Sequence, residues 1–357
     1  MSATGGTGVT TATALMGNTT LNCADDNTPE FNLDSLQTII SIVVPIFFGL
    51  ICVLSVIGNS LVIVIVASNA SMRSTTNILI INLAVADLLF AVFCIPFTAT
   101  DYVLPYWIFG DVWCRIVQYL IIVTACASVY TLVLMSLDRY LAVVHPIASM
   151  SMRTEGRACI AVGIIWIVIL TSSIPVLFIH GEYDEPLSPC DTTSTSQAYC
   201  RILPDANWPL FQATFFGASY VVPLTLISVL YFLMLIRLWK GTRTSVGSRR
   251  GRKRVTRLVL VVVGVFALCW LPIQVILLLK SMGLYTMISS TVALQILSHI
   301  LAYMNSCINP ILYAFLSENF CKAFRKIIYC RSRKSRQTRL GLTTKSSRAG
   351  PSSADIL

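Results

Sequence analysis

The sequence predicts an all-α membrane protein, a bundle of seven transmembrane helices followed by a C-terminal amphipathic surface helix. Hydrophobic residues make up 55% and charged residues 12% of the 357 residues, whereas a soluble domain carries about 25% charged residues. The apolar residues form seven long runs, and about 20 apolar residues suffice for a helix that crosses a bilayer. Most basic residues lie on one side of these runs, which is typical of membrane topology.

The third run, Cys114 to His145, is interpreted as the central helix of the bundle. As a helix, the stretch from Cys114 to Arg139 measures ~37 Å at ~1.5 Å per residue, which exceeds a bilayer core of about 30 Å. Ile121 and Ser128 recur near helical spacing with these two residues. One face of this helix is therefore expected to carry an outer cysteine, a buried hydroxyl and an inner charge.

The other crossings follow from the remaining apolar runs. Pro96 and Pro223 lie inside two of them and predict kinks. Between the fourth and fifth crossings, residues 180–207 are rich in Ser, Thr and Asp and are expected to form a polar outer loop. The six further crossings are expected at residues 36–67, 75–102, 158–178, 208–238, 255–280 and 288–316.

The distribution of basic residues predicts the orientation at the plasma membrane. Nine basic residues lie between Arg237 and Arg257 and ten follow residue 318, whereas only Arg115, Arg201 and Lys280 fall on the opposite side. Because cytoplasmic loops carry an excess of Lys and Arg, the N-terminus is expected outside and the C-terminus inside. The net charge of +10 then reflects topology, and no nucleic-acid partner is expected.

Acidic residues gather in the outer segments, among them Asp101, Asp111 and Glu182. An acidic mouth attracts cations, so these residues favour a cationic ligand. Solvated loops without any ligand preference are the alternative.

The chain ends are expected to lie outside the bundle of residues 37–316. Residues 1–36 should be a flexible extracellular segment with a glycosylation site at Asn18. Residues 317–330 form an amphipathic pattern that favours a helix on the inner leaflet. Cys330 is a candidate palmitoylation site or a free thiol, and residues 331–357 are expected to be a disordered cytoplasmic tail.

One carboxylate, Asp87, falls at mid-membrane. A charge in a transmembrane segment is unfavourable unless it is paired or hydrated, and it therefore indicates function. The pattern predicts an oxygen-lined pocket for a sodium ion, or for a proton and waters; a purely structural polar cluster is the alternative. The polar residues expected at similar depth are Asn59, Ser128, Asn305, Ser306 and Asn309.

At the inner end of the central helix stands Asp138-Arg139-Tyr140. The carboxylate of Asp138 can hold the guanidinium of Arg139 in one state and release it in another, so the pair is a candidate latch. An unremarkable charged helix end is the alternative.

These groups belong to an ordered set with one motif in each crossing. The set resembles the rhodopsin-like G-protein-coupled receptors over about residues 37–330, and within them the neuropeptide receptors of the galanin and allatostatin-A branch. Residues 124–146 and 273–284 are most similar to allatostatin-A receptors. The motifs are Gly58-Asn59, Leu83 to Asp87, Trp107 with Gly110, Cys114, Asp138-Arg139-Tyr140, Trp166, Pro223, Phe266 with Cys269 to Pro272, and Asn309-Pro310 with Tyr313.

The resemblance implies several site residues. Cys114 and Cys200 correspond to the family's disulfide between the central helix and the second outer loop, and Cys190 would then be free to pair with Cys23. The residues implied to switch the bundle between states, beyond the Asp138-Arg139-Tyr140 latch, are Pro223, Tyr231, Phe266, Trp270, Pro272, Pro310 and Tyr313.

The resemblance also implies an extracellular peptide ligand. Ile121 stands where amine receptors carry an aspartate, so a small amine would lack its partner. An allatostatin-like ligand ends in Phe-Gly-Leu-amide, and His299 is a candidate donor to this end or a core histidine. The expected cavity residues are Phe97, Asp101, Gln118, Ile121, Gln274, Leu277, Lys280, Gln295, His299 and Tyr303.

The implied intracellular partners are a heterotrimeric G protein, of the inhibitory class, an arrestin and a receptor kinase. A transporter or channel would show repeats and several intramembrane charges. A retinal-binding pump would need a lysine within residues 288–316, and an intramembrane enzyme would need paired catalytic groups at one depth. The sequence shows none of these patterns, so no enzymatic activity is expected.

Overall fold

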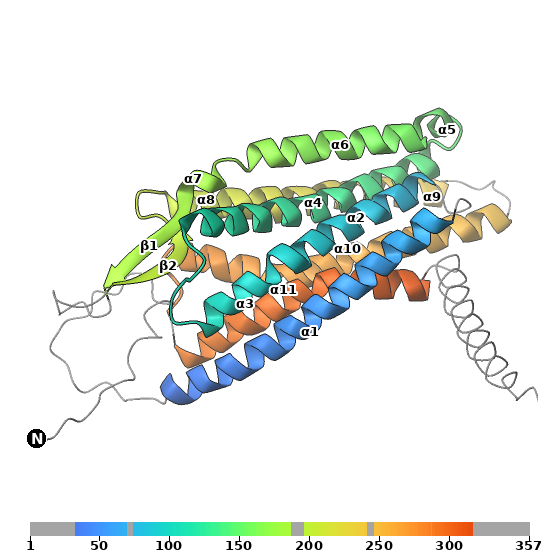
Figure 1. Ribbon diagram of the computed structural model, residues 1–357. Helices are drawn as coiled ribbons and strands as arrows, with labels where there is room; N and C mark the ends of the chain where they lie inside the picture. Colours follow the sequence, from blue (N-terminus) through green and yellow to red (C-terminus); the bar gives the residue numbers. More distant parts are fainter. Residues whose placement is uncertain (1–32, 70–73, 187–195, 241–245, 287, 317–357) are drawn as a thin grey trace, which may run out of the picture.

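The structure is a computed structural model that describes residues 33–69, 74–186, 196–240, 246–286 and 288–316. Within these ranges, seven helical segments are long and apolar enough to cross a membrane. They lie side by side as one bundle (Figure 1), which confirms the predicted fold class. The expected surface helix, the C-terminal tail, and Asn18, Cys23, Cys190 and Cys330 lie outside the described residues.

The first crossing is helix α1 (Leu33–Ser68), which begins three residues before the expected start. The second crossing consists of two helices, α2 (Thr75–Phe93) and α3 (Ile95–Val103), separated at Cys94. Pro96 is the second residue of α3 and has no amide hydrogen to donate to the preceding turn. The predicted kink is therefore a short interruption that redirects the outer end of this crossing.

The central helix is α4 (Asp111–Val144), three residues longer at its start than expected. It packs against α2 and also against the fourth, fifth and sixth crossings. Gly110 precedes it with a φ of 79°, a conformation that glycine adopts without steric penalty. The indole of Trp107 donates to the Gly110 carbonyl at 3.0 Å, which closes the turn that starts the helix.

The fourth crossing is formed by α6 (Glu155–Ser172) and the single turn α7 (Val176–Ile179), with α5 (Ser149–Met152) before them at the opposite end of the bundle. The hydroxyl of Thr154 caps α6 by accepting from the Arg157 amide. Within the bundle, Trp166 donates to Asn82 at 2.8 Å, and Asn82 donates to Thr131 at 2.6 Å. These bonds attach α6 to α2 and α4.

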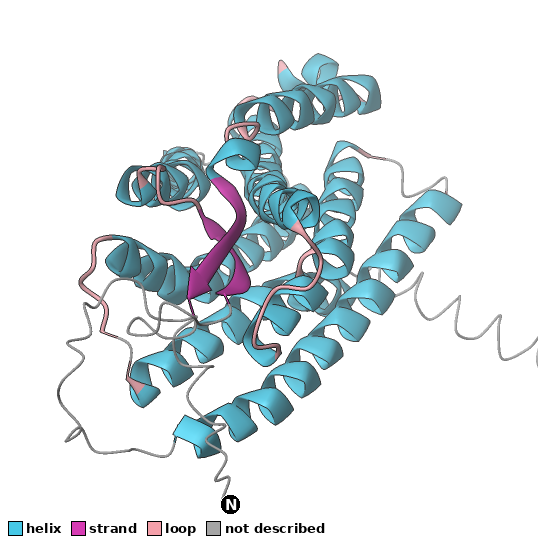
Figure 2. Ribbon diagram, turned by 60° about the vertical axis from the view of Figure 1, so that its left-hand side comes forward, coloured by secondary structure: helices cyan, strands magenta, loops and turns pink. Residues whose placement is uncertain are grey.

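The outer segment between the fourth and fifth crossings is not simply a loop. It contains an antiparallel hairpin of β1 (His180–Pro186) and β2 (Ser196–Ile202), with Glu182 opposite Cys200. The predicted polar outer loop therefore contains regular structure, which its composition did not indicate. The hairpin lies across the end of the bundle (Figure 2), so pairing between its strands satisfies backbone groups next to the helices.

The fifth crossing comprises α8 (Trp208–Phe216), a π-helical turn η3 (Gly217–Val221) and α9 (Val222–Lys240). Pro223 lacks an amide hydrogen and leaves a carbonyl of the preceding turn without its usual partner. The hydroxyl of Tyr130 on α4 donates to the Ala218 carbonyl at 3.0 Å. A side chain of the central helix thus supports the irregular turn.

The last two crossings are α10 (Val246–Ser281), which starts nine residues earlier than expected, and α11 (Ser289–Leu316). Pro272 and Pro310 lie inside these helices. A Cβ at Gly58 of α1 would come within 3.0 Å of the Pro310 ring. The glycine therefore allows α1 to pack closely on α11.

Candidate ligand cavity and buried polar groups

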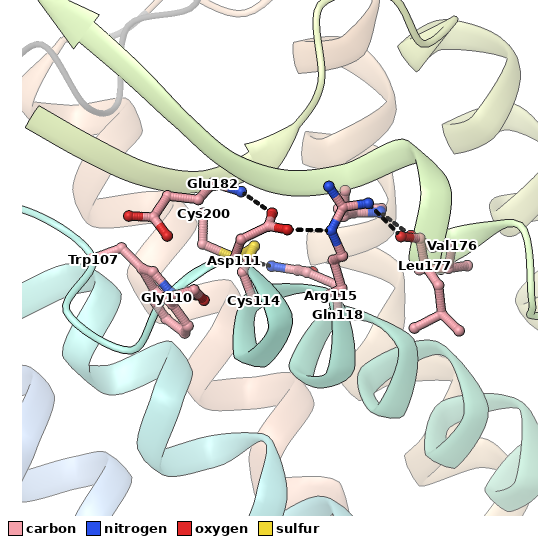
Figure 3. The surroundings of a disulfide bond; sticks show 11 residues. Trp107, Gly110, Asp111, Cys114, Arg115, Gln118, Val176, Leu177, Glu182 and Cys200 are labelled. Atoms are coloured by element: carbon pink, nitrogen blue, oxygen red, sulfur yellow. Dashed lines mark hydrogen bonds and ion pairs between the residues drawn. A yellow bond between two sulfur atoms is a disulfide. The ribbon is translucent and has the colours of Figure 1, made fainter.

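The outer end of the bundle is closed by a disulfide between Cys114 of α4 and Cys200 of β2. This confirms the predicted pairing and the choice of Cys200 over Cys190. Both sulfur atoms lie beneath the hairpin, where the side chain of Gln118 also reaches Cys200 (Figure 3). The bond holds the hairpin against the first turns of the central helix.

Below the hairpin lies a cavity of about 350 Å³. This volume is at the small end of the ~300–1,000 Å³ typical of ligand pockets, so it suits one end of a peptide. Nine of the ten expected cavity residues line it: Phe97, Asp101, Gln118, Ile121, Leu277, Lys280, Gln295, His299 and Tyr303.

Gln274 is the exception among the expected cavity residues. It is 2% exposed and is not part of the lining. Its amide donates to Ser219 of the π-helical turn at 3.1 Å. Its position on α10 therefore directs it to the fifth crossing instead of the cavity.

Sequence reasoning also missed lining residues on the hairpin and on α8. Trp208, Phe211, Gln212 and Phe215 line the cavity and follow helical spacing along one face. That periodicity was visible in the sequence. The contribution of His180 and of residues 199–202 could not be read from the sequence, because it depends on where the disulfide places the hairpin.

A polar network occupies the wall of the cavity between α3 and α11. The Tyr102 hydroxyl lies 2.8 Å from Nδ1 of His299 and accepts a hydrogen bond from Gln295 at 3.1 Å. Tyr102 was not among the expected cavity residues. The network fixes the ring of His299, so this histidine is part of the lining and is also structurally partnered.

The charges of the cavity wall are mixed. Asp101, Lys280 and Arg201 all line it. Arg201 pairs with Glu185, and its guanidinium lies over the rings of Tyr183 and Tyr199 at 5.5 and 5.0 Å, an arrangement that stabilises cations.

His180 adds no charge to this wall at neutral pH, because its burial lowers the pKa of its imidazole to about 4. The lining thus contains two cationic side chains and one carboxylate. The preference for cations expected from the acidic outer segments does not extend to the cavity itself.

Aromatic rings connect the cavity to the centre of the bundle. The ring of Tyr303 lies 5.1 Å from that of Phe90, which lies 6.2 Å from the indole of Trp270. The ring of Phe266 lies 6.0 Å from the indole of Trp270, and the ring of Tyr220 lies 6.5 Å from that of Phe266. These edge, tilted and stacked contacts form a continuous path from a cavity residue to the fifth and sixth crossings.

Asp87 is buried at the middle of the bundle, 1% exposed. Its carboxylate accepts from the Ser128 hydroxyl at 3.1 Å and from the Asn309 amide at 2.8 Å. Asn59 instead donates to the carbonyl of Ser306 at 2.9 Å. The structure therefore brings Ser128 and Asn309 to the carboxylate, with the side chain of Ser306 also beside it. Asn59 is joined to this group through the backbone of Ser306, and the side-chain oxygen of Asn305 has no hydrogen-bond partner.

Three amide oxygens near this level are buried without a hydrogen-bond partner, those of Asn59, Asn305 and Asn309. Oxygen atoms are the ligands preferred by hard cations. Among the described residues there is no cluster of three or more His, Cys, Asp or Glu. The donor set that fits a cation here is one carboxylate with neutral oxygens.

At the inner end of α4, Asp138 holds two arginines. It pairs with Arg139 and accepts from Nε of Arg153 at 2.7 Å. The Thr76 hydroxyl of α2 donates to the same carboxylate at 2.9 Å. Tyr140 packs instead on the ring of His145 at 5.9 Å.

Tyr231 and Tyr313 are two of the residues implied to switch the bundle between states. Tyr231 is buried, 8% exposed, on α9, and the side chain of Tyr313 lies outside the described part of the chain.

The family follows from a comparison with known proteins. Residues 58–313 match the family described as "7 transmembrane receptor (rhodopsin family)". The chain belongs to this family of seven-transmembrane receptors. It is a multi-pass protein of the plasma membrane and, as a receptor, not an enzyme.

Relatives define the branch. The chain is 59% identical over 315 residues to the allatostatin-A receptor of Bombyx mori, covering 87% of this chain and 85% of that one. It is 39% identical over 298 residues to human galanin receptor type 1, covering 81% and 82% of the two chains. The chain is a G-protein-coupled neuropeptide receptor, which implies a peptide ligand and coupling to a G protein.

Proposed function

We propose that the end of a neuropeptide enters the cavity beneath the hairpin and changes the packing around Trp270. The nine expected residues that line the cavity support this proposal. The observation that carries it is the unbroken series of ring contacts from Tyr303 through Phe90 to Trp270 and Phe266. A ligand that binds one packing of these rings better than the other shifts the population of the whole bundle.

The proposed ligand is a peptide ending in Phe-Gly-Leu-amide. The apolar Ile121, Leu277 and Phe97 in the lining suit its Phe and Leu side chains. The similarity to a protein named allatostatin-A receptor supports the choice over a galanin-like peptide. The test is cyclic-AMP or calcium signalling in cells expressing the chain, challenged with a panel of amidated neuropeptides. A response to another peptide, with none to Phe-Gly-Leu-amides, would remove this ligand assignment.

At the cytoplasmic end, Arg139 is proposed to leave Asp138 and contact a G protein of the inhibitory class. An arrestin and a receptor kinase are further proposed partners of the same end. The ion pair between adjacent residues supports a latch, because it can exchange without a change in fold. Arg139→Ala should abolish nucleotide exchange on the G protein while leaving surface expression unchanged. Exchange that persists in this variant would contradict the latch.

The proposed role of Asp87 is to hold a sodium ion with Ser128 and neutral amide oxygens. The unpartnered oxygens of Asn305 and Asn309 support this proposal. Sodium chloride, compared with N-methylglucamine chloride, should raise the melting temperature of the purified wild-type receptor and not that of Asp87→Asn. Equal shifts in both proteins would contradict a sodium site at Asp87.

The proposed orientation places the N-terminus and the hairpin outside the cell. A disulfide persists in an oxidising compartment, and the Cys114–Cys200 bond lies at the hairpin end of the bundle. An epitope tag before residue 36 should be stained on intact cells. Staining that requires permeabilised cells would contradict this orientation.

A further inference from the structure

Two different bonds attach the outer hairpin to the same turn of α4. Cys200 of β2 forms the disulfide with Cys114, and opposite it in the register stands Glu182 of β1. The Glu182 amide donates to Oδ1 of Asp111 at 2.9 Å. Asp111 and Cys114 are three residues apart, which is about one helical turn. Each strand thus has its own attachment to α4, and the two attached residues, Glu182 and Cys200, are opposite each other in the hairpin (Figure 3).

The attachment of β1 extends through Arg115. Its Nε donates to Oδ2 of Asp111 at 2.7 Å, and its Nη1 donates to the carbonyl of Leu177 at 2.8 Å. Leu177 lies in α7, just before the first strand. Asp111 and Arg115 therefore contact the backbone on both sides of the residue where helix α7 becomes strand β1.

Gly181 allows this close approach. A Cβ at this position would lie 2.8 Å from Oδ1 of Asp111 and 3.0 Å from Nη2 of Arg115. Contacts shorter than 3.0 Å force a neighbour to move. By contrast, a Cβ at Gly163 of α6 would meet no atom within 4 Å. The space beside Gly181 is therefore a specific requirement of the contact with Asp111 and Arg115.

The ion pair alone does not explain this arrangement. The side chains of Arg115 and Asp111 are 31% and 44% exposed, and exposed pairs contribute little to stability. Both side chains instead use their remaining hydrogen-bonding groups on backbone atoms of β1 and α7. These hydrogen bonds to the backbone set the position of the hairpin relative to the central helix.

We propose that Asp111, Arg115 and Gly181 form a strand clamp that positions the hairpin for peptide binding. None of the three lines the cavity, whereas His180 and residues 199–202 of the same hairpin do. The disulfide at Cys200 and the hydrogen bond from the Trp107 amide to the Ala198 carbonyl, at 2.7 Å, both hold β2 and leave the tilt of β1 unfixed. The strand clamp attaches β1 as well and fixes the tilt that places Arg201 and His180 over the cavity. This role rests on the proposed binding of a peptide in that cavity.

The test compares Gly181→Ala, Asp111→Ala and Asp111→Asn with the matched control Gly163→Ala. Hydrogen–deuterium exchange of the purified receptors reports on the amides of residues 180–185 and 196–202 without any ligand. Dissociation of a radioiodinated synthetic peptide ending in Phe-Gly-Leu-amide reports on binding, and surface staining reports on folding.

Gly181→Ala and Asp111→Ala should both speed hairpin exchange and accelerate peptide dissociation by about tenfold, since interface changes act mainly on the dissociation rate. Gly163→Ala should match the wild type. Asp111→Asn keeps an acceptor for the Glu182 amide and should be milder than Asp111→Ala. Added to Asp111→Ala, the Gly181→Ala change should have a smaller effect, because the nearest atom that its Cβ meets is gone and Arg115, no longer held by Asp111, can move aside.

Wild-type exchange rates in the hairpin of both Gly181→Ala and Asp111→Ala would overturn the strand clamp. Additive effects in the double variant would also overturn it. If the wild-type receptor does not bind the peptide, the proposed ligand is wrong, and the exchange rates decide the strand clamp independently.

Discussion

The two ends of the central helix are held in different ways. At the outer end, α4 is attached to the hairpin by the Cys114–Cys200 disulfide and by Asp111. At the inner end, Asp138 is shared by Arg139, Arg153 and Thr76 through ion pairs and a hydrogen bond. A covalent bond does not exchange during signalling, whereas ion pairs can be replaced by a partner's groups. The comparison indicates a fixed outer frame and an exchangeable inner end.

Removing the covalent attachment should have the largest effect. The disulfide joins residues separated by 86 positions, and closing a loop of this size stabilises a protein by about 4 kcal/mol. Cys114→Ser should lower the thermal stability of the detergent-solubilised receptor and its surface expression, measured by fluorescence-detected size-exclusion chromatography and staining. Cys159→Ser, which replaces an exposed free cysteine, is the control. Equal stability of the two variants would mean that the outer end is not fixed covalently.

Removing the shared carboxylate should affect signalling more than expression. Asp138→Ala leaves two arginines without their acceptor at a buried position, and breaking a buried pair costs about 3 kcal/mol. We expect basal nucleotide exchange on the G protein to rise in membranes without added peptide. Arg153→Ala removes one of the two guanidinium partners and should give a smaller rise. Wild-type basal exchange in Asp138→Ala would contradict an exchangeable inner end.

Acidification should weaken the outer end through His180. The folded receptor keeps this imidazole neutral down to a pKa of about 4, compared with the ordinary value of 6.5. The unfolded chain binds the proton first as pH falls below 6.5, so the free energy of unfolding decreases between pH 6.5 and 4. At pH 5 the loss should be about 2 kcal/mol, at about 1.4 kcal/mol per pKa unit. The melting temperatures at pH 7 and pH 5 should differ less in His180→Gln than in the wild type. The same difference in both proteins would show that His180 does not cause the loss of stability at low pH.

The smallest effect is expected within the membrane. Tyr130→Phe removes the donor to the Ala218 carbonyl in the π-helical turn and should lower stability by about 1 kcal/mol. The control is Tyr119→Phe, which removes a similar hydrogen bond to the Leu170 carbonyl of the regular helix α6. It shows how much stability is lost when the acceptor is not in a π-helical turn. A smaller melting-temperature shift for Tyr130→Phe than for Tyr119→Phe would show that the π-helical turn does not depend on Tyr130.

The sequence by itself determined the helical bundle, because seven apolar runs of membrane length have no other stable form in lipid. It also determined the disulfide pairing through the family resemblance, and nine residues of the cavity lining, among them Gln118 and Ile121 on one face of the central helix. These predictions succeeded where local periodicity and depth along a helix fix the position of a side chain.

Only the tertiary structure decided the roles of Gln274, Gly181 and the outer hairpin. Gln274 turns from the cavity to Ser219 because of how α10 is rotated against the fifth crossing. At Gly181 there is no space for a Cβ, because Asp111 and Arg115, some seventy residues earlier, would lie within 3.0 Å of it. Such contacts join segments far apart in the chain, and no local pattern records the distance between them.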